Sequence, residues 1–156
     1  ALAAARHTSR VESLTLIGTP VSGEAFDPSD LRADPADTAA LRDSTTALLS
    51  TEFCEAQPDV VARIVDWRAE EDATPAAQAA QQAALEGFDA EPLYELTRPA
   101  LVVAGGNDSV VDSAESRRLA EDLPRGEFRE YPDAGHLLTV ERSAPLNDEL
   151  VGWLDG

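Results

Sequence analysis

The feature that most constrains the fold is a continuous apolar run, Ala100–Gly105, which ends in a glycine pair. Apolar residues at every position, rather than at alternate ones, are typical of a strand that is buried on both faces of a parallel sheet. A helical pattern follows over 113–123, and a second strand pattern follows over 127–131. A strand–helix–strand crossover makes its two strands parallel neighbours, so the sequence predicts an α/β fold.

Two further segments extend this predicted core. Residues 11–19 are largely apolar and end in the breakers Gly18 and Pro20, which predicts another buried strand. The alanine-rich residues 1–7 before it are typical of the end of a helix. A closing helix is predicted over 144–154, with its apolar face formed by Leu146, Leu150, Val151 and Leu154.

The segment between these parts has a different pattern, with repeated prolines, helical spacing and no strand pattern. We predict one helix around Leu41, Leu48, Leu49 and Phe53, a second around Val60, Val61, Ile64, Val65 and Arg68, and a third over 75–85. The predicted organisation is therefore a core of residues 1–22 and 97–156, with a helical segment, residues 23–96, inserted into it.

The charge balance narrows the class of partner. The chain of 156 residues has 30 acidic and 12 basic residues, a formal charge of −18. Such a surface repels phosphate backbones, so we expect no nucleic-acid partner. With no apolar run near the ~20 residues of a membrane span and no signal segment, we predict a cytoplasmic protein without membrane contact. The acid excess favours adaptation to a salty interior over the drift of a GC-rich genome.

Two chemically active residues follow neighbouring predicted strands. Asp108 follows the first strand of the crossover and His136 follows the second. Neighbouring strands lie ~4.8 Å apart, so both side chains should reach the same edge of the sheet, where open α/β sheets bind ligands. A carboxylate beside an imidazole fixes its tautomer and stabilises the imidazolium. Either residue alone could be a turn or loop residue, but together they predict a catalytic pair.

Glycines surround both residues. Gly105 and Gly106 should let the chain leave the strand sharply, and we expect Gly135 to adopt a positive φ and present His136 on a tight turn. The pattern implies no metal and no organic cofactor. Cys54, the single cysteine, cannot form an internal disulfide, and we expect it to be a buried apolar residue.

Residues 96–156 resemble the C-terminal part of an α/β-hydrolase-fold protein. The matching elements are Pro99 before the strand, Gly105-x-x-Asp108 as the acid loop, Gly135-His136-Leu137 as the histidine loop, and Glu141 before the last helix. Residues 1–20 resemble the helix after the nucleophile elbow and the strand that follows it. The helical segment is similar to the cap of esterase-, enol-lactonase- and haloperoxidase-like members. Asp112 departs from the family, which often has proline there.

This resemblance implies the C-terminal three strands of a parallel sheet, flanking helices and a helical cap. It also implies a hydrolase acting on an ester, lactone or similar acyl bond, in which Asp108 orients His136 and His136 activates a nucleophile or a water. The family's G-x-S-x-G elbow does not occur in the sequence. Its place would fall before Ala1, so we expect a truncated chain that is inactive by itself.

The substrate contacts predicted at this edge are Ser22, Val110 and Leu137, for a small acyl substrate. Ser22 follows a core strand at the correct edge; without a strained elbow it is not expected to be the nucleophile. We expect Glu141 to have a structural rather than a catalytic role.

Two other functions stay open at this point. One is a relative with an aspartate nucleophile, such as an epoxide hydrolase or haloalkane dehalogenase, which the residue at the elbow would distinguish. The other is a non-enzymatic pseudo-hydrolase that binds a ligand through the helical segment. The predicted strand 11–19 would also have an unpaired edge, which predicts self-association or a complementing N-terminal piece.

Overall fold

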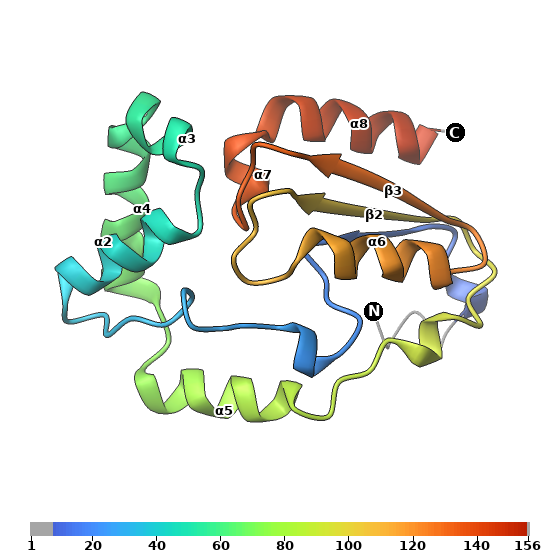
Figure 1. Cartoon of the computed structure of the whole chain (residues 1–156), viewed down its shortest axis with the longest axis horizontal. Helices are drawn as coiled ribbons and strands as arrows, with labels where there is room; N and C mark the ends of the chain where they lie inside the picture. The colour runs from blue at the N-terminus through green and yellow to red at the C-terminus, as the bar shows by residue number, and fades with distance from the viewer. Residues whose placement is uncertain (1–7, 156) are drawn as a thin grey trace.

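A three-stranded parallel sheet forms the centre of the computed structural model, which describes residues 8–155 (Figure 1). The strands are β1 (Leu14–Ile17), β2 (Ala100–Gly105) and β3 (Gly126–Tyr131), in the order β1-β2-β3. Helices flank the sheet, so the predicted α/β class with three parallel strands is confirmed. The helix end expected over 1–7 lies outside the described residues.

The strand register brings the three carboxyl ends to one edge of the sheet. Ile17 of β1 is opposite Val103 of β2, and Gly105 of β2 is opposite Tyr131 of β3. All six residues of β2 are buried, as expected for the central strand. Within residues 8–155, β1 pairs with β2 alone, so its other edge has no strand beside it.

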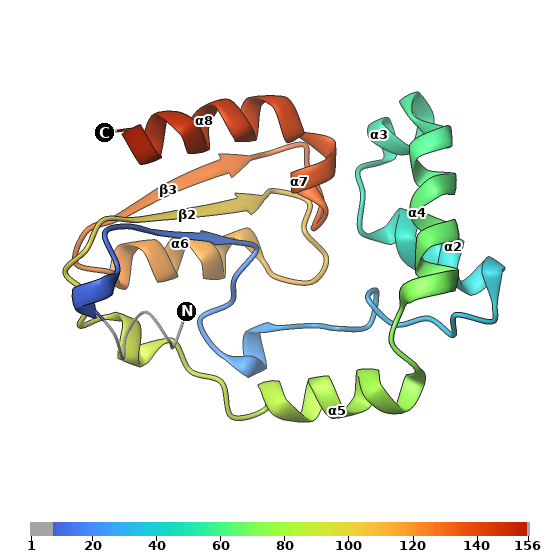
Figure 2. The ribbon, with the colours of Figure 1, turned by 180° about the vertical axis from the view of Figure 1, so that it is seen from behind.

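Each face of the sheet is covered by a different helix. Helix α6 (Ser113–Asp122) packs on β2 and β3 from one side, and α8 (Ser143–Asp155), preceded by the short α7 (Leu138–Glu141), covers the other (Figure 2). Alternate residues of β2 serve the two layers. Val102 packs with Leu119 and Ala120 of α6, whereas Leu101 and Val103 pack with Leu138 and Leu146.

The prediction of which residues form the apolar face of the closing helix is partly wrong. Leu146 is buried and Leu150 packs on the sheet, but Val151 is 60% exposed and Leu154 is 68% exposed. Trp153 packs inward instead. The inward residues are spaced i, i+4 and i+7, and each outward residue follows one of them, about 100° further round the helix.

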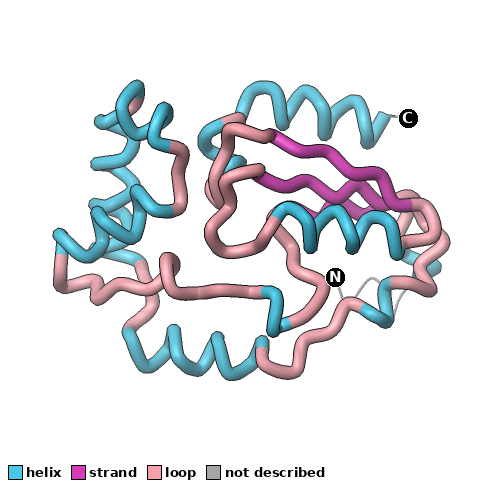
Figure 3. The backbone as a smooth tube through the Cα atoms, viewed as in Figure 1, coloured by secondary structure: helices cyan, strands magenta, loops and turns pink. Residues whose placement is uncertain are grey.

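The helical segment contains η2 (Gly23–Ala25), α2 (Thr38–Ala47), α3 (Thr51–Ala56), α4 (Pro58–Glu71), α5 (Pro75–Leu85) and η3 (Glu91–Leu93). Three of these helices, α2, α3 and α4, stand opposite the carboxyl ends of the strands, whereas α5 lies below the sheet and long loops join these parts (Figure 3). The helices predicted around Val60–Arg68 and over 75–85 are present, the latter with the expected bounds. The short 3-10 helix before β1 is η1 (Thr8–Arg10).

The helix predicted around Leu41 to Phe53 is two helices. Ser50 is extended, with φ −66° and ψ 147°, and its hydroxyl accepts a hydrogen bond from the Phe53 amide, which caps α3. Leu48 and Leu49 are buried just before this break. The helical spacing alone would continue one helix through this point. The helix breaks here instead, because Ser50 caps a new helix and the linker with the two buried leucines packs against the loops of the sheet.

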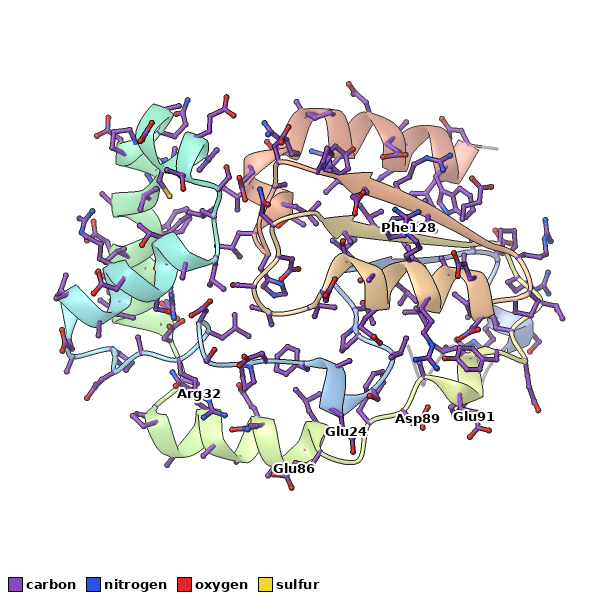
Figure 4. The ribbon with its side chains drawn as sticks, in the orientation of Figure 1. Glu24, Arg32, Glu86, Asp89, Glu91 and Phe128 are labelled. Carbon is purple, nitrogen blue, oxygen red and sulfur yellow. The ribbon has the colours of Figure 1, made fainter. Side chains whose placement is uncertain are left out.

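Acidic side chains line the exposed lower margin of the molecule. Glu24, Glu86, Asp89 and Glu91 lie there, around η2, the end of α5 and η3 (Figure 4). None of the helices in residues 8–155 has both the length and the apolar character needed to cross a bilayer.

Candidate functional site: an Asp–His pair at the sheet edge

Asp108 and His136 meet where β2 and β3 end. The imidazole Nδ1 is 2.9 Å from Asp108 Oδ2 and 3.1 Å from Oδ1. The Asp108 side chain is fully buried, and the His136 side chain is 19% exposed. Because a carboxylate only accepts, this contact assigns the ring proton to Nδ1 and leaves Nε2 as the proton acceptor. The proximity is as the strand ends predict, and the catalytic roles stay predictions.

The acid loop holds the Asp108 carboxylate with backbone amides. Its Oδ1 accepts hydrogen bonds from Val110 N at 2.8 Å and from Val111 N at 2.9 Å. Each of these hydrogen bonds fixes the direction in which the carboxylate faces His136. Asp108 therefore shapes its own turn and also meets the imidazole.

Gly105 and Gly106 let the two loops pack backbone against backbone. A Cβ on Gly105 would lie 2.4 Å from the Gly135 carbonyl oxygen, and one on Gly106 would lie 2.5 Å from the Pro132 oxygen. The Gly106 amide also donates to the Tyr131 carbonyl at 2.9 Å. No side chain fits at either position, so the glycines set the distance between the acid and histidine loops.

The positive φ expected for Gly135 is wrong, because Gly18 is the one glycine with positive φ, 53°, among the described residues. Gly135 is required for space instead, since a Cβ there would lie 2.6 Å from the Leu48 carbonyl oxygen. At Gly18, just past β1, a Cβ would lie 3.4 Å from His136 Cε1 and 3.6 Å from Asp108 Oδ2. Gly18 therefore forms one wall beside the pair.

The linker between α2 and α3 contacts both loops of the pair. The Ser109 hydroxyl donates to the Ala47 carbonyl at 3.2 Å, and the Leu137 amide donates to the Leu48 carbonyl at 3.0 Å. Glu141 is buried, as a structural role requires, and accepts hydrogen bonds from Ser50 and Gly135. Sequence reasoning missed the linker because its partners lie far along the chain and carry no local pattern.

The predicted substrate residues line two different clefts. Ser22 and Val110 line one of about 720 Å³ beside the acid loop, and Leu137 lines another of about 600 Å³ beside the histidine loop. Val110 is only 2% exposed and packs with Leu48, so most of its side chain is core. The first cleft borders Asp108 but does not expose its carboxylate.

The cleft beside the histidine loop is the more apolar of the two in the side chains that line it. Residues from the helical segment meet the loop there, with glutamines of α5 at the margin. Its apolar side chains are Phe26, Pro28, Leu31, Leu48, Ile64, Ala73, Leu85 and Leu137, and the charged Arg32, Arg68, Glu71 and Asp72 also line it. An apolar wall beside charged and amide groups suits a small organic molecule that has polar substituents.

Cys54 is half-buried rather than buried, and its pKa is raised. Burial is the largest cause, and the negative charges of Glu141 and Glu55 follow. No group of three or more His, Cys, Asp or Glu residues within 8–155 is placed to hold a metal ion.

Comparison with known proteins assigns this chain to one family. The family model described as alpha/beta hydrolase fold matches residues 1–143. Among solved structures, the enol-lactonase from Burkholderia xenovorans LB400 superposes with a TM-score of 0.79 and 26% identity, over 98% of this chain and 60% of that one. A thermophilic esterase from Thermogutta terrifontis shares the fold, with a TM-score of 0.74 and 21% identity over 97% of this chain and 58% of its own.

Curated relatives match over shorter lengths. RutD of Caulobacter vibrioides, a protein assigned carbamate hydrolysis by name only, is 35% identical over 74 residues, which is 47% of this chain and 28% of RutD. RutD of Serratia proteamaculans is 36% identical over 72 residues, 46% of this chain and 27% of that protein. These matches cover about a quarter of each relative's length. The family model, in contrast, matches most of this chain, and the chain therefore belongs to the α/β-hydrolase fold family.

Proposed function

We propose that this chain carries the acid and the histidine of a hydrolase that acts on an ester, a lactone or a similar acyl bond. The observation that carries the proposal is the buried Asp108 carboxylate, 2.9 Å from His136 Nδ1 at the carboxyl edge of a parallel sheet. Relatives named for lactone, ester and carbamate chemistry support this bond class.

In the proposed mechanism, His136 Nε2 takes a proton from a nucleophile or a water as that oxygen attacks the acyl carbon. The imidazolium that forms is stabilised by Asp108, whose two backbone hydrogen bonds hold it in place. The proton then passes from Nε2 to the leaving group. G-x-S-x-G does not occur in the sequence, so these residues supply the base and its orienting acid rather than an elbow serine.

The proposed acyl site is the apolar cleft beside the histidine loop. Leu137 is adjacent to His136 and forms part of this cleft, with the helical segment acting as a cap over it. Ser22 and Val110 line the neighbouring cleft and would contact the other part of the substrate.

The test is an assay of the complete product of the gene that encodes this sequence, with 4-nitrophenyl esters, lactones and a carbamate. We expect His136→Ala and Asp108→Asn each to lower kcat/KM by about 10³–10⁴-fold. Asp133→Asn is the matched control, because Asp133 is an exposed acid in the histidine loop and lines neither of the two clefts. Unchanged turnover in the first two variants would falsify the proposal.

The nucleophile class has its own test. A fluorophosphonate reagent labels an activated serine and leaves an aspartate nucleophile unlabelled, so labelling that depends on His136 favours the esterase class. The 156-residue chain by itself is expected to show no ester turnover. Turnover by this chain that His136→Ala abolishes contradicts that expectation.

We also propose that the chain associates through β1. Strand β1 presents an edge without a neighbouring strand in the described residues, and such an edge can pair with a second copy or with an N-terminal piece. Size-exclusion chromatography with light scattering should show oligomers. A monodisperse monomer that unfolds cooperatively contradicts this part of the proposal.

A further inference from the structure

Glu141 is an acid in an unusual place. It ends α7, five residues after His136, and is only 9% exposed. Burying a carboxylate costs free energy unless hydrogen-bond donors replace the lost water. The surface already holds most of the 30 acidic residues, so solubility does not explain a buried one. Its partners show what it does.

The two carboxylate oxygens of Glu141 face different parts of the chain. Oε1 accepts from the amide of Gly135, the residue before His136, at 2.7 Å. Oε2 accepts from the Ser50 amide at 3.1 Å and from the Ser50 hydroxyl. The same hydroxyl caps α3, accepting from the Phe53 amide. One side chain therefore joins the histidine loop to the helical segment.

The backbone amides of the residues on both sides of His136, Gly135 and Leu137, are held by hydrogen bonds. Glu141 holds the Gly135 amide, and the Leu48 carbonyl accepts from the Leu137 amide at 3.0 Å. Gly135 lies so close to Leu48 that a Cβ would meet the Leu48 oxygen at 2.6 Å. With the backbone held at the residue before and at the residue after His136, contacts outside the pair limit how the His136 side chain can turn relative to Asp108.

We propose that Glu141 is a positioning residue, which sets the orientation of His136 by bonding the Gly135 amide to the Ser50 end of α3. This inference rests on the proposed function only in taking His136 as the catalytic base. Glutamine should not replace Glu141, because its amide must turn an NH₂ group toward either Gly135 N–H or the Ser50 donors. The His136–Asp108 hydrogen bond would then open more often.

The experiment observes that hydrogen bond directly by proton NMR of the 156-residue chain. The Nδ1 proton of an imidazole bonded to a carboxylate resonates far downfield and exchanges slowly with water. The chain has only two histidines, so His7→Gln and Asp108→Asn assign the His136 signal. In Glu141→Gln we expect exchange to accelerate about tenfold or more, as for the loss of one charged hydrogen bond. Ser50→Ala should accelerate it less.

Glu149→Gln is the matched control. Glu149 is also an acid on the sheet side of the molecule, but its carboxylate accepts from the Tyr131 hydroxyl at 3.0 Å and pairs with Arg129 at 2.9 Å rather than with the backbone of the histidine loop. Thermal unfolding of each variant reports whether it is folded. The control should leave Nδ1 exchange unchanged, whereas a merely structural role for Glu141 would lower stability without changing that exchange.

Three outcomes overturn the proposal. One is unchanged exchange in folded Glu141→Gln, or in folded Ser50→Ala if Glu141→Gln does not fold. Another is an equal acceleration in Glu149→Gln. The third is a parent chain without the signal that Asp108→Asn removes, which shows that the pair is not formed and overturns the proposed function as well. The first two leave the proposed function intact, so the two failures are distinguishable.

Discussion

The sheet part, residues 97–156, and the helical segment are stabilised by different kinds of contact. In the sheet part the central strand is wholly buried, and its side chains pack with α6 on one face and α8 on the other. In the helical segment, where Leu41, Val61 and Val65 are also buried, the side chain of Arg68, 12% exposed, forms a polar network. It donates to Ser44 Oγ at 2.9 Å and to Leu31 O at 2.9 Å, and pairs with Asp72 at 2.8 Å.

Apolar packing therefore places the Asp108–His136 pair, whereas a hydrogen-bond network shapes the cleft. Apolar packing depends on total volume and tolerates small shifts, and it supports a backbone that brings Asp108 and His136 together. A hydrogen-bond network depends on every partner, since each donor or acceptor left unpaired costs free energy. The helical segment, which lines the proposed acyl cleft, should therefore respond to single polar substitutions more sharply than its few buried residues suggest.

The largest expected effect is that of Arg68→Ala. Removing the guanidinium leaves Ser44, Thr45 and the Leu31 carbonyl without their donor, so the free energy of unfolding should fall by about 2–3 kcal/mol. Arg63→Ala, an exposed arginine on the same helix, should change it by less than about 0.5 kcal/mol. Urea unfolding measures both. Equal losses of unfolding free energy in the two variants would show that the Arg68 hydrogen bonds do not stabilise the helical segment, and the contrast with the sheet part would disappear.

Alanine substitution of one glycine in each region tests how tightly the sheet part is packed. Gly105→Ala places a Cβ against the Gly135 and Ala134 carbonyl oxygens, so we expect a loss of about 2 kcal/mol and a disturbed Asp–His pair. Gly87→Ala, in the helical segment, meets nothing within 4 Å and should leave stability unchanged or raise it by up to about 1 kcal/mol. Unfolding midpoints and the Nδ1 signal report the outcome. A harmless Gly105→Ala would show that the loops are not in close contact.

Salt should act in opposite directions on the repulsion across the whole chain and on the ion pair of the helical segment. Molar KCl screens the repulsion of a chain with charge −18 and also weakens the ion pair of Arg68. If the acid excess is halophilic adaptation, the melting temperature should rise by about 2–4 °C for each kcal/mol of repulsion relieved. Thermal melts across a KCl series measure this. A flat or falling midpoint favours genome composition as the origin of the acids.

The smallest effect concerns the contact between the two regions. Cys54 lies in the helical segment, and its pKa is raised by burial first and by Glu141 of the sheet part second. Glu141→Gln should lower that pKa, so the thiolate fraction at pH 8 and the rate with a disulfide reagent should rise about two- to threefold. Glu52→Gln, which is not among the causes of the shift, is the control. Identical rates would place Glu141 too far from Cys54 for the structure described.

Much of the sheet part could be predicted from local pattern. The buried run of β2, the crossover to β3 and the positions of Asp108 and His136 after the two strands all follow from residue spacing and strand geometry. The break at Ser50, the network of Arg68 and the bonds of Glu141 could not be predicted in this way. Each depends on residues that are distant in the chain, and local spacing does not show which distant groups will meet.

The three glycines around the pair have a consequence for mutational scanning. Gly18, Gly105 and Gly135 contribute no functional group, yet a methyl at any of them would approach the imidazole, the opposite loop or the Leu48 carbonyl. A saturation library scored for activity would rank all three beside Asp108 and His136. Intolerance would record a lack of space at Gly105 and Gly135 and the positive φ at Gly18, and only a library scored for folding and for activity separately would distinguish these backbone constraints from chemistry.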